Sequence, residues 1–326
     1  MALSSPVPQV PGPSAPGRWL RVHHETRYDY GATVELAHHL ACLQPRDTPW
    51  QQVRAWSLSI DPLPDEWLAL PEDQPWPPLQ HSRDPWGNGR LAFSLSRVHG
   101  SLRVGSRFEA GLRPREPLAL ADSPDWCGVA AGLRYHQGLT DGEAVEFSLG
   151  TPLAPRDPRL AEYARASFTP GRGLMAAAVE LMHRIHADFR YRPASTEVST
   201  SAPQALALRQ GVCQDFAHVL IGGLRSLGLA ARYVSGYLLT HPPEGQPRLV
   251  GADASHAWAE VWCPQLGWCP LDPTNDQVPG LDHVTLAWGR DYADVAPLRG
   301  VIRGGGRAAP HVAVTVEPLE EGGETP

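Results

Sequence analysis

The sequence lacks lysine altogether: all 28 basic residues among its 326 are arginine, as expected from a genome that favours arginine codons. It also lacks any apolar run approaching the roughly 18 residues that cross a bilayer, which excludes a membrane-spanning helix and a membrane partner. Its start, MALSSPVPQVPGPSAPG, has neither the basic beginning nor the apolar centre of a signal peptide. We therefore expect a cytoplasmic protein.

Cysteine is scarce, and its number is odd. The five cysteines cannot all pair with one another, so free thiols are expected, one of which can be functional. The net charge of −7 argues against a nucleic-acid partner. No carboxylates at metal-ligand spacing accompany the 14 histidines, and no acidic loop suits calcium, so we expect neither a metal nor a cofactor.

Proline and glycine are frequent instead, at 34 and 31 residues, which indicates many turns and short strands. Residues 1–17 predict a disordered tail, because they are dominated by proline, serine and glycine. Over residues 18–115, short stretches such as 53–60 and 91–95 alternate apolar and polar side chains. Turn sequences, above all Asp84-Pro85-Trp86-Gly87-Asn88, separate them. This region is therefore predicted to be a β-rich, sandwich-like domain.

Helices and strands both occur in the second half, which favours an α+β domain over residues 116–300. Helical periodicity ends near Asp188, and a longer helix opens at Cys213 and stops at Gly228. Three strands are then predicted, at 232–239, 255–262 and 267–272.

The C-terminal part, residues 301–318, is predicted to supply one further strand. Valines alternate with polar neighbours at 311–316, which is typical of an edge strand. A short tail is expected at 319–326.

A cysteine, a histidine and an aspartate stand where these elements can bring them together. Cys213 lies at a predicted helix start, where unpaired backbone amides and the helix dipole favour a thiolate. Histidine can take and return a proton near neutral pH, and His256 lies in the second predicted strand. The turn at 264–267 reverses the chain, so Asp272 falls roughly opposite His256 and can orient its imidazole.

These stretches resemble the bacterial transglutaminase-like family. The motifs that carry the resemblance are Gly211-Val212-Cys213-Gln214-Asp215-Phe216-Ala217-His218, Ala231-Arg232-Tyr233-Val234-Ser235-Gly236-Tyr237, Asp253-Ala254-Ser255-His256-Ala257-Trp258 and Leu271-Asp272-Pro273-Thr274. Phe189-Arg190-Tyr191 upstream and Gly289-Arg290-Asp291-Tyr292-Ala293-Asp294-Val295 downstream extend the match. The resemblance implies an α+β fold: a papain-like transglutaminase core, with motifs at 189–276, preceded by an N-terminal β-sandwich-like domain.

The resemblance also implies a reaction. Cys213 would be the nucleophile, His256 the acid/base and Asp272 its orienting partner. The expected activity is that of a cysteine-dependent amide hydrolase or acyl transferase, acting on peptide or protein amides through a thioester. Hydrolysis and transfer fit equally well. The Cys213 backbone amide is expected to bind the oxyanion, and the second donor stays open between Tyr191 and Gln210, which are chosen by position only.

Two alternatives from other classes are a non-catalytic peptide-binding module and a scaffold that interacts through its N-terminal domain. Neither needs three mutually oriented reactive groups. Among the neighbouring residues, Gln214, Asp215 and His218 indicate local hydrogen bonding rather than catalysis. Trp258 and Trp262 fit either an acyl channel or core packing. Cys263 and Cys269 are expected to be two packed thiols rather than a disulfide.

Overall fold

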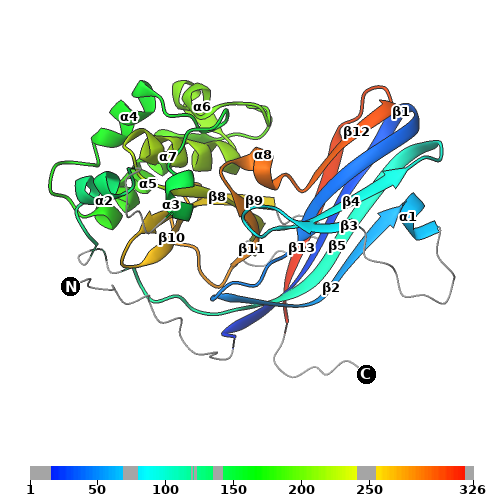
Figure 1. Ribbon diagram of the computed structural model, residues 1–326, viewed down its shortest axis with the longest axis horizontal. Coiled ribbons are helices and arrows are strands. Elements are labelled where there is room, and N and C mark those ends of the chain that lie inside the picture. Colours follow the sequence, from blue (N-terminus) through cyan, green and yellow to red (C-terminus); the bar gives the residue numbers. More distant parts are fainter. Residues whose placement is uncertain are drawn as a thin grey trace, which may run out of the picture.

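The computed structural model describes residues 16–68, 80–118, 120, 123–134, 142–240 and 255–319. The tail expected at 1–17 lies outside this part except for its last two residues, as does the tail at 319–326 except for its first. Long strands gather at one end of the molecule, and most of the helices gather at the other around a smaller sheet (Figure 1). The α+β class and the β-rich N-terminal region are confirmed.

The β-rich part is one seven-stranded sheet built around a single long strand, β1. The first half of β1 pairs with β5 and β13, and its second half pairs with β4 and β12. The sequence indicated only a short strand near Trp19, but β1 continues through Gly31 to Gln44. The strands are β1 (Arg18–Gln44), β2 (Gln51–Asp61), β3 (Gln80–Arg83), β4 (Gly89–Leu95), β5 (His99–Leu112), β12 (Leu298–Gly304) and β13 (Pro310–Leu319).

The last two strands belong to this sheet although they follow the core in sequence. β13 contains the predicted 311–316 segment and pairs antiparallel with β1, so that Thr26 lies opposite Val312. β12 was not predicted, because its residues are almost all exposed and show no alternation. The first and last strands of the chain are thus neighbours.

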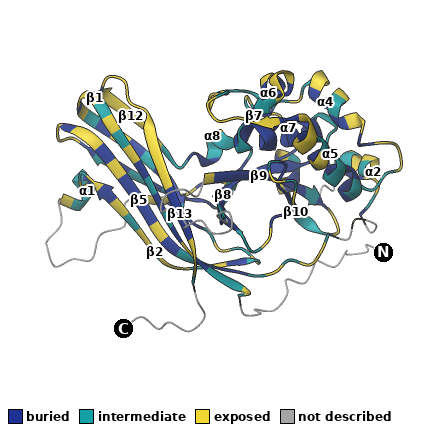
Figure 2. Ribbon diagram, turned by 180° about the vertical axis from the view of Figure 1, so that it is seen from behind, coloured by how far each residue is buried: buried dark blue, intermediate teal, exposed yellow. Residues whose placement is uncertain are grey.

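The core sheet has four antiparallel strands in the order β10-β9-β8-β11. Strands β8 and β9 are buried almost throughout, as Figure 2 shows in dark blue. The strand segments predicted from the sequence match three of the four; β11 was not predicted. The four are β8 (Ala231–Leu238), β9 (Ser255–Cys263), β10 (Gly267–Leu271) and β11 (His283–Gly289).

Helix α7 (Cys213–Ser226) is the central helix of the core. It contacts β8 and β9 on one side and three other helices, α4, α5 and α6, on the other. All residues from Gln214 to Arg225 are buried, as expected of a helix that is enclosed on every side. Gly222 permits the close approach of α4, because a Cβ atom there would lie 2.7 Å from Leu160.

The remaining elements are short except for the helices that enclose α7. These are α4 (Pro158–Arg165), α5 (Leu174–Asp188) and α6 (Ala202–Leu208), and α6 begins with the predicted capping box of Ser201 and Gln204. The others are α1 (Asp65–Leu68), α2 (Trp126–Gly132), α3 (Gly142–Glu146), α8 (Tyr292–Val295), β6 (Arg190–Tyr191) and β7 (Gln210–Gly211).

Two side-chain amides join the N-terminal sheet to the edge of the core sheet. Gln51 donates to the backbone oxygen of Thr285 at 2.7 Å and accepts from its N–H at 2.8 Å. Asn88, from the predicted turn, does the same with Trp288 at 2.7 and 3.1 Å. Both side-chain amides are buried. They hydrogen-bond the backbone of β11 along the edge that faces away from β8, where β11 has no partner strand. The N-terminal region is therefore fixed against the core by backbone-like pairing.

Candidate active site

Cys213 is the first residue of α7, so its backbone amide has no partner inside the helix. Asp215 holds this helix start: its Oδ2 accepts the Val212 N–H at 2.8 Å and the Thr196 hydroxyl at 2.7 Å. Gly211 is needed for this, because a Cβ atom there would lie 2.4 Å from the same oxygen. The Cys213 side chain is partly exposed and lines a cavity. A thiol next to free amides and open space is placed to react.

His256, the second residue of β9, lies between Cys213 and Asp272. Its Nε2 is 2.7 Å from Oδ2 of Asp272, which leaves Nδ1 available to the thiol of Cys213 in the shared cavity. The pairing of β9 with β10, continued by one residue, places Asp272 opposite Trp258 rather than opposite His256. The contact between Asp272 and His256 is therefore diagonal across the hairpin, and not between directly opposite residues as expected. Both side chains lie on the same face of the hairpin, as expected.

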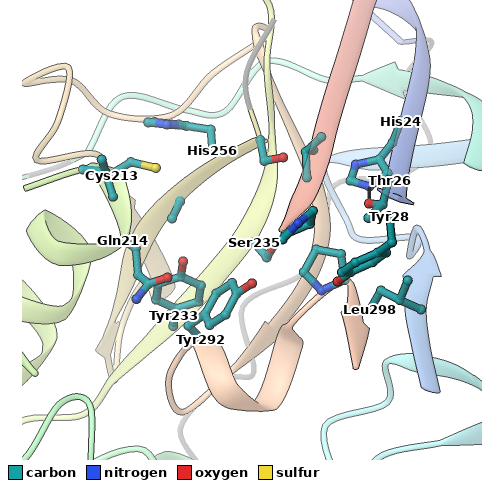
Figure 3. Close-up of a pocket in the computed structure, with 16 residues that line it drawn as sticks. His24, Thr26, Tyr28, Cys213, Gln214, Tyr233, Ser235, His256, Tyr292 and Leu298 are labelled. Carbon is teal, nitrogen blue, oxygen red and sulfur yellow. Dashed lines mark hydrogen bonds between the residues drawn. The ribbon is translucent and has the colours of Figure 1, made fainter. Parts of the chain in front are cut away.

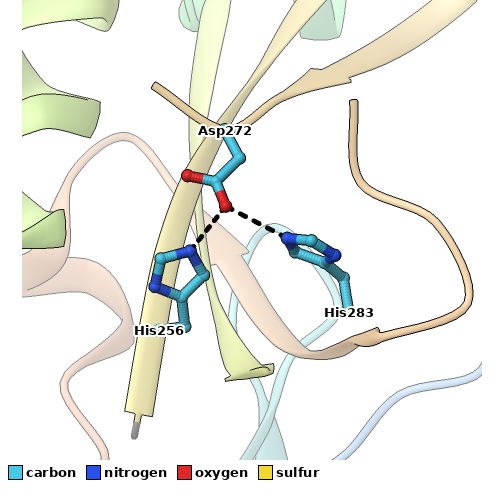
Figure 4. Close-up of side chains that lie close together, drawn as sticks. All are labelled: His256, Asp272 and His283. Atoms are coloured by element: carbon cyan, nitrogen blue, oxygen red, sulfur yellow. Dashed lines mark hydrogen bonds and ion pairs between the residues drawn. The ribbon is translucent and has the colours of Figure 1, made fainter. Parts of the chain in front are cut away.

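Asp272 is fully buried and accepts hydrogen bonds from five N–H groups. Figure 4 shows the two that come from His256 and His283. Oδ2 binds Nε2 of His256, Nε2 of His283 at 3.1 Å and Nδ2 of Asn275 at 2.8 Å. Oδ1 accepts the backbone N–H groups of Thr274 and Asn275 at 3.0 and 3.2 Å. Burial alone would raise the pKa of Asp272, but these donors hold it below its usual range. The carboxyl group is therefore ionised at neutral pH.

The charge on Asp272 acts on His256. Burial alone would lower the pKa of His256, but the hydrogen bonds to Asp272 and to the Cys213 thiol outweigh burial and raise it to about 10. The imidazole therefore keeps its proton at neutral pH. A cationic imidazolium holds a proton that it can give to a leaving group.

His283 is a member of this group that the sequence did not indicate. It begins β11, and burial lowers its pKa despite the contact with Asp272. A neutral ring that donates from Nε2 carries no proton on Nδ1, and this atom has no hydrogen-bond partner among the described residues. No local motif surrounds His283 in the sequence, because its role depends on where β11 packs.

The same three groups are also of types that bind metals. The ligand atoms of His256, Asp272 and His283 all lie within 4.8 Å of one another. Two ligands on a tetrahedral zinc at about 2.0–2.1 Å would be roughly 3.3 Å apart. The His256–Asp272 distance of 2.7 Å is shorter and is that of a direct hydrogen bond. The arrangement thus matches a hydrogen-bonded relay better than a metal centre.

A cavity of about 220 Å³ lies beside Cys213 and extends to the N-terminal sheet (Figure 3). Its core side is formed by Cys213, His256, Tyr233, Ser235 and Tyr292, among others. The opposite side is formed by residues of β1 and β13, which contribute His24, Thr26, Tyr28, Pro310 and Val312. The N-terminal sheet is thus part of the site.

The two candidates for a second oxyanion donor differ in their relation to the thiol. Burial raises the pKa of Tyr191, and the charge of Cys213 adds to the shift, so the phenol lies within electrostatic reach of the sulfur. Tyr191 is in β6, and Gln210 is in β7, which runs parallel to it. The choice between them stays a prediction.

The residues next to Cys213 form local hydrogen bonds, as expected. Gln214 donates to the backbone oxygen of Val198 at 3.0 Å. His218 accepts the backbone N–H of Tyr292 at 3.2 Å, and burial lowers its pKa to about 3, so it stays neutral.

The tryptophans and the two hairpin cysteines belong to the interior. Trp258 packs edge-on against His283 and is buried, and Trp262 packs against Trp268. Neither tryptophan lines the cavity at Cys213. Cys263 and Cys269 are buried free thiols in the described structure.

Comparison with known proteins identifies the family of this chain. The profile of the transglutaminase-like superfamily matches residues 161–273, and that of the bacterial transglutaminase-like N-terminal region matches residues 20–70. An uncharacterised protein of Mycobacterium tuberculosis is 38% identical over 308 residues, which cover 92% of this chain and 93% of that protein.

Two further proteins share part of the sequence or the fold. A protein-glutamine gamma-glutamyltransferase of Pseudomonas aeruginosa is 32% identical over 152 residues, 44% of this chain and 22% of that enzyme. The crystal structure of a proposed cysteine protease from Cytophaga hutchinsonii superposes with a TM-score of 0.69 at 19% identity, covering 93% and 91% of the two chains. This chain belongs to the transglutaminase-like superfamily and carries the N-terminal region of its bacterial members.

Proposed function

We propose that this protein is a cysteine-dependent amide hydrolase or acyl transferase that acts on peptide or protein amides. Cys213 is its nucleophile, His256 its acid/base and Asp272 the group that orients His256. The observation that carries the proposal is the position of His256, which hydrogen-bonds to a buried carboxylate and lines the same cavity as the Cys213 thiol. A peptide-binding module or a scaffold would have no need of this arrangement.

The reaction follows from the protonation states. The Cys213 thiolate attacks the carbonyl carbon of a carboxamide and forms a carbon–sulfur bond, while the carbonyl oxygen becomes an oxyanion. The Cys213 backbone amide is one donor to this oxyanion. The proton on His256 passes to the leaving nitrogen, the carbon–nitrogen bond breaks, and ammonia or an amine departs. A thioester on Cys213 and a neutral His256 remain.

The second half of the reaction decides between the two activities. Water or an amine attacks the thioester carbon while His256 removes its proton, and the carbon–sulfur bond breaks to release the Cys213 thiolate. Attack by water gives a carboxylate, and attack by an amine gives a new amide. Two similar proteins are described one as a glutamyltransferase and the other as a proposed cysteine protease. Likeness of fold does not select between these reactions. Both products are therefore measured in the test.

The test uses a glutamine-bearing peptide with and without a small primary amine. A mass increase on Cys213 equal to the acyl group supports the thioester, and amine incorporation or ammonia release then distinguishes transfer from hydrolysis. Cys127 offers a matched control, because it is exposed whereas Cys42, Cys263 and Cys269 are buried. An adduct on Cys127 alone, with none on Cys213, would refute the proposal.

The location of the protein is a separate proposal. None of the helices in the described ranges is long and apolar enough to cross a membrane. All five cysteines are free, which suits a reducing compartment. We therefore keep the cytoplasm as the proposed location.

A further inference from the structure

The side of the cavity that faces Cys213 comes from the N-terminal sheet, and its composition is unusual for a surface that meets solvent. We call it the β1–β13 wall and define it by His24, Thr26, Tyr28, Pro310 and Val312. Neighbouring strands place its members together, since Thr26 pairs with Val312 and Tyr28 with Pro310. Figure 3 shows His24, Thr26 and Tyr28 across the cavity from the Cys213 sulfur.

The wall is polar but carries no charge. His24 is fully buried, and burial together with the nearby His23 lowers its pKa to about 4, so the ring is neutral. Its Nε2 lies 2.8 Å from the Thr26 hydroxyl, and its Nδ1 has no partner in the described structure. Burial also raises the pKa of Tyr28, which keeps the phenol neutral. The wall therefore offers hydrogen-bonding groups without ionised ones.

The core side of the cavity continues this pattern. Tyr233, Ser235 and Tyr292 contribute hydroxyl groups, and burial raises the pKa of both tyrosines. None of the described lining residues is Asp, Glu or Arg, so the Cys213–His256 pair is the charged group of this cavity as described. A carboxylate or ammonium group bound here would lose water, and the described charges that it would meet, those of Cys213 and His256, already pair with each other, which is unfavourable.

The size of the cavity limits what enters it. About 220 Å³ is less than the roughly 300–1,000 Å³ of sites for drug-sized ligands. It suits one uncharged side chain and its adjacent backbone. Val312 lies at the edge of the cavity and is 50% exposed, so a longer substrate would pass over it.

We propose that the β1–β13 wall binds the acyl donor next to its reacting carboxamide and selects donors whose neighbouring residues are uncharged. This inference rests on the proposed function, because it concerns the donor in the same reaction. It gives the N-terminal sheet a role in specificity in addition to its role in the fold.

The test places a charge on the wall at Val312. Half exposure allows Val312→Arg and Val312→Glu to keep their charges in water, so both variants should fold. Val301 is the matched control, because it is 77% exposed on the neighbouring strand β12 and does not line the cavity. Val301→Arg and Val301→Glu carry the same charges elsewhere on the sheet, and thermal melts verify folding of all four.

The first measurement needs no substrate. In a Cys127→Ala background, Cys213 is alkylated with neutral iodoacetamide and with anionic iodoacetate, and the ratio of the two rates is taken. Val312→Arg should shift this ratio toward iodoacetate by roughly threefold to tenfold, and Val312→Glu should shift it the other way, as expected for charges near a partly exposed site. The shift should decrease with added salt. An unchanged ratio of alkylation rates in both variants would contradict the position of the β1–β13 wall beside Cys213.

The second measurement compares three glutamine peptides that differ only in flanking alanine, aspartate or arginine. The unmodified protein should have the highest kcat/KM with alanine, and Val312→Arg should improve the aspartate peptide by a similar factor. Equal kcat/KM for the three peptides would overturn the selectivity. Loss of turnover with all three, together with a shifted alkylation ratio, would refute the amidase or transferase proposal and with it the donor role of the wall, while the position of the wall beside Cys213 would stay supported.

Discussion

His283 donates to the same oxygen of Asp272 that binds His256, although the two histidines come from strands that are separated by β8 in the sheet. The carboxylate therefore ties the start of β11 to the strand that presents the candidate acid/base. A donor to Asp272 both limits its rotation and stabilises its charge, so His283 acts as a positioning residue.

Replacement of His283 by phenylalanine should lower kcat by about tenfold and change KM little, because Asp272 loses one donor while the ring volume is kept. His283→Gln, which retains an N–H donor, should recover part of the rate. The pKa of Asp272 is held low by its donors, so the loss of one moves it upward. The acid limb of the rate profile should therefore shift to higher pH in His283→Phe, which pH-dependent kinetics would detect. An unshifted profile would assign His283 a packing role only.

Asp272→Asn should reduce kcat by roughly a thousandfold or more while KM changes far less, because His256 loses the charge that orients it. Steady-state kinetics on one donor peptide measure both constants. Asp276→Asn is the control, since Asp276 contacts His183 on the surface and not the Asp272 group. A large loss in both variants would show that disruption of this loop, and not loss of the charge, is responsible.

Cys213→Ala should abolish turnover and leave the melting temperature nearly unchanged, because the thiol lies at a helix start beside a cavity and not in the core. Removal of the sulfur atom therefore loses few packing contacts. Activity assays and calorimetry on the purified variant check both statements. Retained activity would disprove the nucleophile assignment.

The rate of the first half-reaction should fall at high pH. The pKa of His256 is raised to about 10, so the proton needed by the leaving group is present below that value and lost above it. The same shift stabilises the fold fully below the unfolded value of about 6.5, and this contribution is lost as pH rises through about 10. Melting temperatures from pH 6 to 11 should fall less steeply in His256→Gln than in the unmodified protein. Parallel curves would contradict this linkage.

Gln51→Ala should destabilise the protein by about 2–4 kcal/mol, because it leaves a buried backbone N–H and oxygen of Thr285 without partners. The neighbouring exposed Gln52 supplies the control substitution, Gln52→Ala, which should stay within about 0.5 kcal/mol. Denaturant unfolding of both variants gives the comparison. Equal free energies of unfolding for the two variants would show that the Gln51 amide contributes little to the contact between the N-terminal sheet and β11.

The proposed reacting groups could be predicted because each lies in a short local pattern. Cys213 starts a helix, and His256 and Asp272 come from one hairpin, so neighbouring elements suffice to bring them near one another. The diagonal offset of Asp272 escaped prediction, because the ends of the two strands could not be placed to the residue.

The rest of the site depends on contacts between distant parts of the chain. His283 lies in β11, whose alternation is interrupted by an irregularity between Thr285 and Ala287, so no strand was predicted there. His24 and Thr26 follow the alternation of the strand that begins at Arg18, but nothing in that pattern says which sheet they face. The start of helix α4, in contrast, could have been recognised in the sequence, because Asp157 is its N-cap residue and Pro158 is its first residue.

The pairing of Thr26 with Val312 has a consequence for the synthesis of the chain. A ribosome makes β1 well before β13, so the long strand β1 must wait for this partner. A nascent chain that ends before Pro310 already contains the cysteine, histidine and aspartate of the proposed triad, yet it lacks one side of the proposed donor site. The proposed reactive groups are thus made before the strand that completes the proposed donor site, so the proposed discrimination between donors is acquired only after β13 has been synthesised.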